Sequence, residues 1–160
     1  MSVVDIEMLS GLMSRNDRLM GIDLGTKTIG LALSDVGRSL ASPLRTIVRT
    51  KFGKDAAEIF ETAAQFQVAG LVVGLPLNMD GSEGPRVQST RAFVRNLLGI
   101  RDIAVGFWDE RLSTAAVERE LVAQDVSRKK RAAVIDRMAA AYILQGALDR
   151  MSRAPFIHQP

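Results

Sequence analysis

The chain has 160 residues, 47% of them hydrophobic and 24% charged, which is typical of one globular domain with a sizeable core. It has no cysteine, which excludes disulfide bridges and thiolate metal sites, and too few aromatic residues, 5%, to bind nucleic acid mainly by base stacking. The formal net charge of +3 and a pI of about 9.7 weakly favour a polyanionic partner, and no apolar run is long enough to span a membrane.

The first strong pattern is an alternation of apolar with small or polar residues. It covers residues 19–24 and 29–34 and predicts two strands, joined as a hairpin by the turn 25–28. We expect Gly25 to take a positive φ in this turn. Asp23 is unusual, because a carboxylate inside a strand is costly to bury unless something binds it. It either caps its own turn or belongs to a metal or phosphate site at the end of the sheet.

The rest of the chain alternates between the two-residue period typical of strands and the 3.6-residue period typical of helices. We expect a short amphipathic helix within residues 1–18, and Pro43 should place the third strand at a sheet edge because proline cannot donate to a ladder. Gly99 is expected to cap the helix before it. The elements after the hairpin are, in order, a strand at 39–49, a helix at 54–67, a strand at 71–75, a loop at 78–85, a helix at about 85–98, a strand at 103–107, a helix at about 113–124 and a helix at about 129–150.

This order predicts an α/β fold with a mixed sheet, in which an antiparallel meander is followed by parallel strands reached through helical crossovers. Strands of such a sheet have a common end where sites form. We expect acids at this end: Asp23 near the end of the first strand, Asp109 and Glu110 after the last strand, and Asp136 on the final helix. The residues around Asp136 are small enough for that helix to pack close to the sheet: Ala132, Ala139 and Ala140.

Three carboxylates gathered at this end would raise one another's pKa unless a cation neutralised them. Oxygen ligands favour Mg²⁺ or Mn²⁺ over zinc, and two such ions about 4 Å apart can stabilise an in-line phosphoryl displacement. Taken singly, each acid has a simpler explanation, since Asp136 can pair with Lys130 or Arg131 and Glu110 with Arg111. Taken together, and with the basic run before the last helix, they favour a metal site.

The basic run consists of Arg128, Lys129, Lys130 and Arg131. A charge run is usually a solvated face, but beside a carboxylate cluster it also fits a segment that binds phosphates. The only histidine, His158, lies in the tail. With no cysteine and no serine–histidine–acid arrangement, we expect metal-activated water rather than covalent catalysis.

Four segments resemble the successive motifs of the YqgF family. YqgF proteins are bacterial proteins first proposed as Holliday junction resolvases and now regarded as pre-16S rRNA nucleases, and the resemblance covers roughly residues 19–149. The segments are residues 21–30 (GIDLGTKTIG), 73–81 (VGLPLNMDG), 109–114 (DERLST) and 135–140 (IDRMAA).

The resemblance implies a ribonuclease H-like mixed five-stranded sheet flanked by helices over residues 19–150, with 1–18 as an N-terminal extension and 151–160 as a tail. It implies a cytoplasmic, metal-dependent endonuclease that uses Mg²⁺ or Mn²⁺, as a monomer or homodimer. Its substrate would be the 5′ end of pre-16S rRNA in ribosome biogenesis, or alternatively a Holliday junction. The expected catalytic and metal-binding residues are Asp23, Glu110 and Asp136. The residues expected to contact nucleic acid are Lys27, Asn78, Arg111, Arg128, Lys129, Lys130 and Arg131.

One departure from the wider ribonuclease H-like superfamily is the absence of an acid at the end of the fourth strand. Gly74 stands there, so Glu110 or its neighbour Asp109 would have to take the place of that acid. Two rival functions remain. The Asp-x-Gly-Thr segment also resembles the phosphate loop of sugar kinases, actin and Hsp70-type ATPases, which need two such domains, and a non-catalytic nucleic-acid-binding module would also keep the fold.

Overall fold

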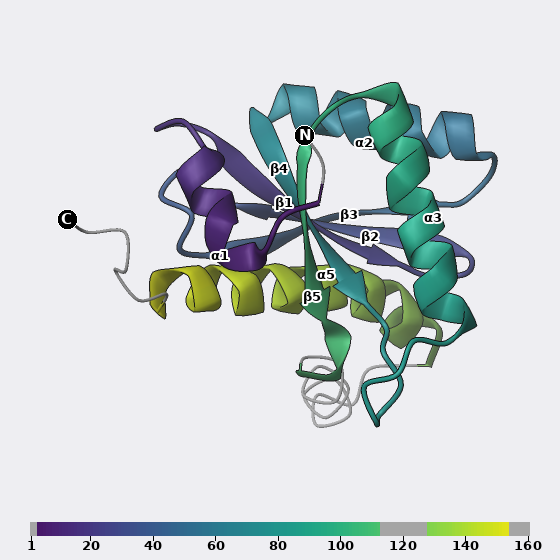
Figure 1. The fold of residues 1–160 in the computed structure, drawn as a ribbon. Coiled ribbons are helices and arrows are strands. Elements are labelled where there is room, and N and C mark those ends of the chain that lie inside the picture. Colours follow the sequence, from purple (N-terminus) through teal and green to yellow (C-terminus); the bar gives the residue numbers. More distant parts are fainter. Residues whose placement is uncertain (1–2, 113–127, 154–160) are drawn as a thin grey trace.

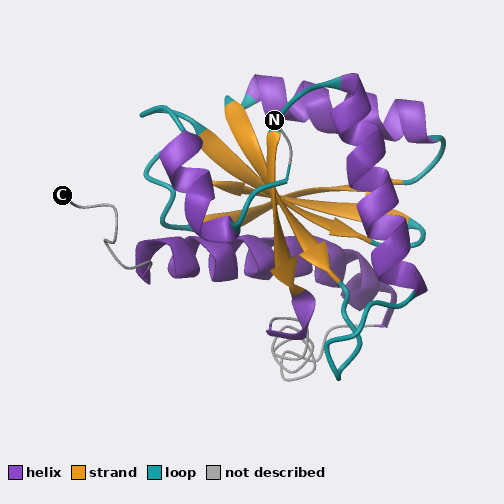
Figure 2. Cartoon of the chain, in the orientation of Figure 1, coloured by secondary structure: helices purple, strands orange, loops and turns teal. Residues whose placement is uncertain are grey.

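The computed structural model of the chain describes residues 3–112 and 128–153, with the side chains of residues 3–111 and 138–152. Its centre is a five-stranded sheet in the order β3-β2-β1-β4-β5, seen as a twisted fan in Figure 2. The strands are β1 (Arg18–Leu24), β2 (Thr28–Ser34), β3 (Ala41–Val48), β4 (Val68–Leu75) and β5 (Ala104–Asp109). The first three pair antiparallel, and β4 and β5 run parallel to β1. The mixed sheet expected from the sequence is confirmed.

Helices cover both faces of this sheet. The helical elements are α1 (Ile6–Leu9), η1 (Ser10–Leu12), α2 (Phe52–Gln65), α3 (Pro85–Ile100), η2 (Glu110–Leu112) and α5 (Arg128–Arg153). In Figure 1, α2 and α3 lie on one side of the sheet and α5 lies on the other. No helix in the described part of the chain is long and apolar enough to cross a lipid bilayer. The helix expected at 113–124 lies outside the described residues.

The side chains of β1 divide between two cores because successive residues of a strand point to opposite faces. Met20, Ile22 and Leu24 belong to the core under α2 and α3. Leu19 belongs to the core under α5, and Gly21 has α5 directly above it. Asp23 has the same parity as these two residues, so it lies on the α5 face.

The contact between α5 and β1 is very close. A Cβ at Gly21 would lie 2.6 Å from the carbonyl oxygen of Ala140 and 2.8 Å from the Cβ of Leu144. Glycine is therefore required here by space, because any side chain would lift the helix from the strand. The expectation that this helix packs close to the sheet through small residues is confirmed.

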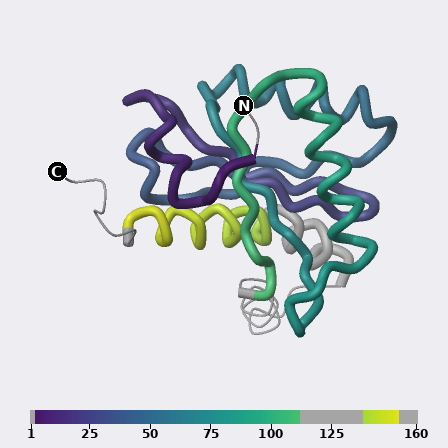
Figure 3. Tube along the Cα trace, in the orientation of Figure 1, coloured from purple at the N-terminus to yellow at the C-terminus, as the bar shows by residue number. Residues whose placement is uncertain are grey.

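The N-terminal segment covers the outer edge of β5, beside which it runs in Figure 3. Val3 forms a parallel bridge with Val105, and the backbone N–H of Val4 donates to the Val105 carbonyl at 2.8 Å. Ile6 and Leu9 pack over Gly106, where a Cβ would lie 2.8–2.9 Å from their Cδ1 atoms. The expected N-terminal helix is confirmed in α1 and η1, and its segment covers what would otherwise be an unpaired strand edge.

Two predictions about glycines are wrong, and one about proline is confirmed. Gly25 does not have a positive φ; it is needed because a Cβ would lie 2.9 Å from the Thr28 carbonyl oxygen, to which its own N–H donates. Gly99 does not cap α3, since the helix continues to Ile100. Pro43 lies in β3, at the edge of the sheet, as expected.

We predict that Gly21→Ala lowers the free energy of unfolding by about 1–3 kcal/mol, because the added methyl group must displace the backbone of α5. Gly99→Ala is the matched control. No atom lies within 4 Å of a Cβ at Gly99, so this change should raise stability by about 0.5–1 kcal/mol. Urea unfolding monitored by circular dichroism measures both values, and equal effects of the two variants would contradict the close contact.

Candidate active site

The candidate site lies at the edge of the sheet where the parallel strands β1, β4 and β5 end. Asp23 is the last residue but one of β1, and Glu110 follows β5 directly as the first residue of η2. Ile22 pairs with Val73 in β4, and Leu75 pairs with Asp109 in β5. These registers place Asp23 at the level of Gly74 and Glu110 just beyond the level of Leu75, on either side of β4.

The carboxyl groups of Asp23 and Glu110 are hydrogen-bonded to each other. Burial raises the pKa of Glu110 to about 8, and the charge of Asp23 and the hydrogen bond to it add to this rise. The charge of Arg86 acts in the opposite direction. Two carboxyl groups can share a hydrogen bond only if one holds a proton, so burial and mutual repulsion favour a single shared proton near neutral pH.

Gly74 explains how Glu110 reaches this position. A Cβ at Gly74 would lie 2.8 Å from Cγ and 2.9 Å from Cδ of Glu110, and 2.5 Å from Cδ1 of Ile143 on α5. The side chain of Glu110 therefore fills the space above β4 that a side chain at position 74 would need. Glu110 therefore reaches from the end of β5 over β4, and its expected role in place of an acid on β4 stays a prediction.

Asp109 is engaged elsewhere. Its carboxylate accepts hydrogen bonds from Nε of Arg111 at 2.9–3.0 Å and forms an ion pair with Nη2 of the same residue. The hydrogen bond from Arg111 holds the pKa of Asp109 below its ordinary value. Between the two acids that the sequence left open, the geometry therefore favours Glu110 as the partner of Asp23.

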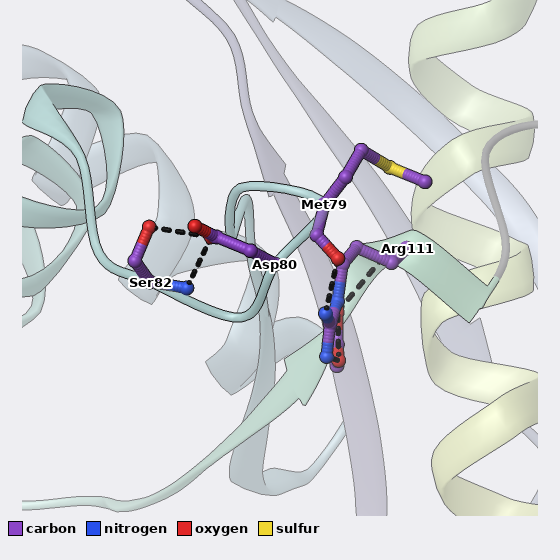
Figure 4. Close-up of polar contacts among 5 residues, drawn as sticks. Met79, Asp80, Ser82 and Arg111 are labelled. Carbon is purple, nitrogen blue, oxygen red and sulfur yellow. Dashed lines mark hydrogen bonds and ion pairs between the residues drawn. The ribbon is translucent and has the colours of Figure 1, made fainter.

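Arg111 also fastens the loop that follows β4. Its Nη1 donates to the Met79 carbonyl at 3.0 Å, as Figure 4 shows, so one guanidinium joins the end of β5 to this loop. Within the loop, the Asn78 N–H donates to the Ser82 carbonyl at 3.0 Å, and Gly81 has a φ of 89°. The sequence predicted the loop but not its attachment through Arg111. The only signal for that contact in the sequence was the short spacing between Asp109 and Arg111.

The structure says less about the other residues that were predicted to bind metal or nucleic acid. Lys27 is exposed in the turn between β1 and β2, and its carbonyl accepts a hydrogen bond from the Arg49 N–H at 2.9 Å. Asp136 and the run 128–131 lie on α5, but their side chains are outside the described residues. Their expected roles, like that of Asn78 and Arg111 in binding nucleic acid, stay predictions.

The path of α5 bears on Asp136. Gln145 accepts a hydrogen bond from the Ala41 N–H at 2.9 Å, and Ala41 pairs with Ser34, at the far end of the hairpin from the turn 25–28. The turns of α5 before Ala140 therefore lead toward the end of the sheet where Asp23 lies. Asp136 lies one helical turn before Ala140 in α5.

The described acids suit a hard divalent cation. Asp23 and Glu110 offer only oxygen donors, and a cation between them would replace the shared proton and remove their repulsion. Among the residues whose side chains are described, no three acidic or histidine side chains gather into a metal site, and Asp136 is not among those residues. The oxygen donors of Asp23 and Glu110 therefore fit Mg²⁺ or Mn²⁺.

Comparison with known proteins settles the family. The model of the RuvX family, described as Holliday junction resolvase, matches residues 17–150. The chain belongs to the RuvX family. This confirms the resemblance to YqgF proteins, and membership makes the chain a hydrolase, a nuclease acting on phosphodiester bonds.

Individual relatives agree with this assignment. A protein of Beijerinckia indica is 63% identical over 150 residues, 94% of this chain and 91% of its own. A protein of Methylocella silvestris is 60% identical over 151 residues, 94% of both chains, and both relatives bear the name "Putative pre-16S rRNA nuclease". The solved structure of T. thermophilus RuvC with a Holliday junction covers 84% of this chain and 96% of its own at 18% identity, with a TM-score of 0.51. This last likeness shows the shared ribonuclease H-like fold.

We predict that Glu110→Gln flattens the pH dependence of stability when divalent cations are chelated. The pKa of Glu110 is raised from 4.5 to about 8, so the folded protein holds a proton that the unfolded chain releases, and stability should fall as pH rises through this window. Above pH 8, the free energy of unfolding of the variant should exceed that of the wild type by on the order of 2–4 kcal/mol, and below pH 4.5 the two should not differ through this proton.

Urea unfolding between pH 4.5 and 8.5 in EDTA measures this difference, and Glu83→Gln is the control of opposite sign. The hydrogen bond from Arg91 lowers the pKa of Glu83, so its loss should reduce stability above pH 4.5. The same pH slope in Glu110→Gln and the wild type would show that the two carboxyl groups are not coupled.

Proposed function

We propose that this protein is a divalent-metal-dependent endonuclease whose metal ligands and catalytic residues are Asp23, Glu110 and Asp136. The hydrogen-bonded carboxyl pair at the strand ends supports this most directly, because a nuclease of this fold works with acids gathered at that edge. Asp136 is included because α5 leads toward the same edge. Mg²⁺ and Mn²⁺ are the ions that suit these oxygen donors.

The side chains of the site have separate tasks. Asp23 and Glu110 would hold the cation through their carboxylate oxygens, after losing their shared proton to solvent. A bound divalent cation supplies the charge that activates water and stabilises an in-line displacement at phosphorus. Arg111 keeps the loop 78–85 beside the carboxylates, where Asn78 and the backbone amides of the loop can approach phosphates.

For the substrate, we propose the 5′ end of pre-16S rRNA, which makes the protein a cytoplasmic enzyme of ribosome biogenesis. The names of relatives at about 60% identity over most of the chain support RNA. The family description favours a second candidate, the Holliday junction.

A cleavage assay separates these two substrates. Purified protein is incubated with Mn²⁺ and, in parallel, with a 16S precursor 5′ leader and a four-way DNA junction. We expect cleavage of the leader at a defined position and little cleavage of the junction. Resolution of the junction with an intact leader would transfer the assignment to DNA, and cleavage of neither would reject the nuclease proposal.

We predict that Asp23→Asn lowers the rate of cleavage by several orders of magnitude while the protein stays folded. The change keeps the size of the side chain but removes a charge needed to hold the cation. Asp102→Asn, at the opposite edge of the sheet near the start of β5, is the control and should cleave normally. Full Mg²⁺-dependent cleavage by a folded Asp23→Asn variant, free of contaminating nuclease, would overturn the assignment.

We predict that the basic run adds affinity rather than chemistry. Replacing residues 128–131 with glutamine should weaken RNA binding and reduce the slope of log K against log[salt] by roughly 0.7–0.9 for each phosphate that the run neutralises. The control replaces Arg15 and Arg101, which are exposed cations at the starting edge of the parallel strands. Fluorescence anisotropy over a salt series measures both slopes, and an unchanged slope in the first variant would refute its role.

A further inference from the structure

A hollow of about 490 Å³ lies at the end of β1. It is on the α3 side of the sheet, whereas the carboxyl pair is on the α5 side. It is formed by Leu24 and the turn after it, by Arg49 and Thr50 after β3, and by the first residues of α3, whose start lies beside this turn in Figure 1. None of the residues that line it is acidic. The hollow is therefore concave, cationic and separated from Asp23 only by the end of one strand.

Arg49 is held firmly at the wall of this hollow. Its Nη1 donates to the Gly25 carbonyl at 2.6 Å, and its guanidinium lies over the ring of Phe93 at 5.5 Å from the centroid. A guanidinium has five N–H donors, so the bond to Gly25 leaves most of them for a ligand. In the described part of the chain Arg49 has no carboxylate partner.

Arg86, in the first turn of α3, forms the facing wall. Its Nη2 makes a long contact of 3.4 Å to the Leu24 carbonyl, which places its guanidinium beside the end of β1. Glu83, the acid nearest to Arg86 along the chain, is paired with Arg91 at 2.8 Å. Arg86 therefore faces the hollow rather than the acid that precedes its own helix.

The hydroxyl groups around the two arginines complete a polar lining. Thr26, Thr50 and Ser89 are all exposed at its surface. The N–H and hydroxyl of Thr50 donate to the buried carboxylate of Asp55, which fixes Thr50 and does not itself line the hollow. The Asp55 carboxylate is therefore already hydrogen-bonded to Thr50, just before α2 begins.

We propose that this hollow binds a backbone phosphate of the nucleic-acid substrate, with Arg49 and Arg86 as its charged ligands. Paired guanidinium groups suit phosphate oxygens because they donate two parallel hydrogen bonds and stay charged. A strand that crosses the end of β1 then has one phosphate in the hollow and another at Asp23 and Glu110. The proposal rests on the proposed nuclease function, and it adds binding residues that the sequence did not single out.

The test measures binding without cleavage. Arg49→Gln, Arg86→Gln and the double variant are made in the Asp23→Asn background, and anisotropy of a labelled 5′ leader RNA is followed over a salt series in EDTA. Arg101→Gln is the matched control, because Arg101 also lies over a phenylalanine ring, that of Phe60 at 5.7 Å, but at the opposite edge of the sheet.

Each single variant should weaken binding about tenfold and lower the salt slope by about 0.7, the value for one phosphate of a single strand. Arg49→Lys should keep the slope while losing part of the affinity, since it retains the charge but not the fork of donors. Arg101→Gln should change neither quantity. Unchanged affinity and slope in the folded double variant would overturn the proposal.

Kinetics then separate this proposal from the proposed function. With Asp23 restored, Arg49→Gln should raise KM for the leader about tenfold and change kcat little, because the phosphate it binds is not the one that is cleaved. Wild-type protein that binds RNA through both arginines but cleaves nothing would reject the nuclease function and leave the phosphate site standing. Wild-type cleavage with unaltered KM in the double variant would do the reverse.

Discussion

The arrangement of the site depends on two carboxyl groups that meet at the edge of the sheet where β1, β4 and β5 end. Asp23 and Glu110 come from different strands, share a hydrogen bond and lie where burial and like charge raise the pKa of Glu110 to about 8. Such a pair is unfavourable for the protein alone. A shared proton relieves the repulsion in the protein alone, and in the proposed nuclease a divalent cation would take the place of that proton.

Glycine makes the crowding possible. At Gly74 the missing side chain leaves room for Glu110, and at Gly21 it lets the backbone of α5 rest on β1. Both glycines lie on the α5 face of the central strands. Their lack of side chains therefore lets α5 pack close to β1 and leaves space for Glu110 over β4. The side chain of Glu110 thus reaches over β4 from the end of β5.

The edge of the sheet can be read as one surface from β3 to β5. Arg49 and Arg86 line a cationic hollow at one end, the carboxyl pair lies in the middle, and Arg111 fastens the loop at the other end. Cations on both sides of a carboxylate pair suit a polyanion that lies across it, because phosphates bind at the flanks while the acids receive the cation. In the proposed function, the arginines position the strand and the acids hold the cation that promotes its cleavage.

The sequence by itself determined the sheet, the order of its elements and Asp23 as an acid at the end of the first strand. Alternation fixed β1 and β2, Pro43 marked the edge strand, and Asp23 was recognisable because a strand interior is a costly place for a charge. Only the tertiary structure decided between Asp109 and Glu110, since the choice depends on which carboxylate Arg111 engages. The predictions for Gly25 and Gly99 failed locally, since Gly25 is required by the nearby Thr28 carbonyl and α3 continues past Gly99. The positions of Arg49 and Arg86 around one hollow were beyond the sequence. They follow from contacts between segments far apart in the chain, whereas periodicity and spacing report only on neighbours along it.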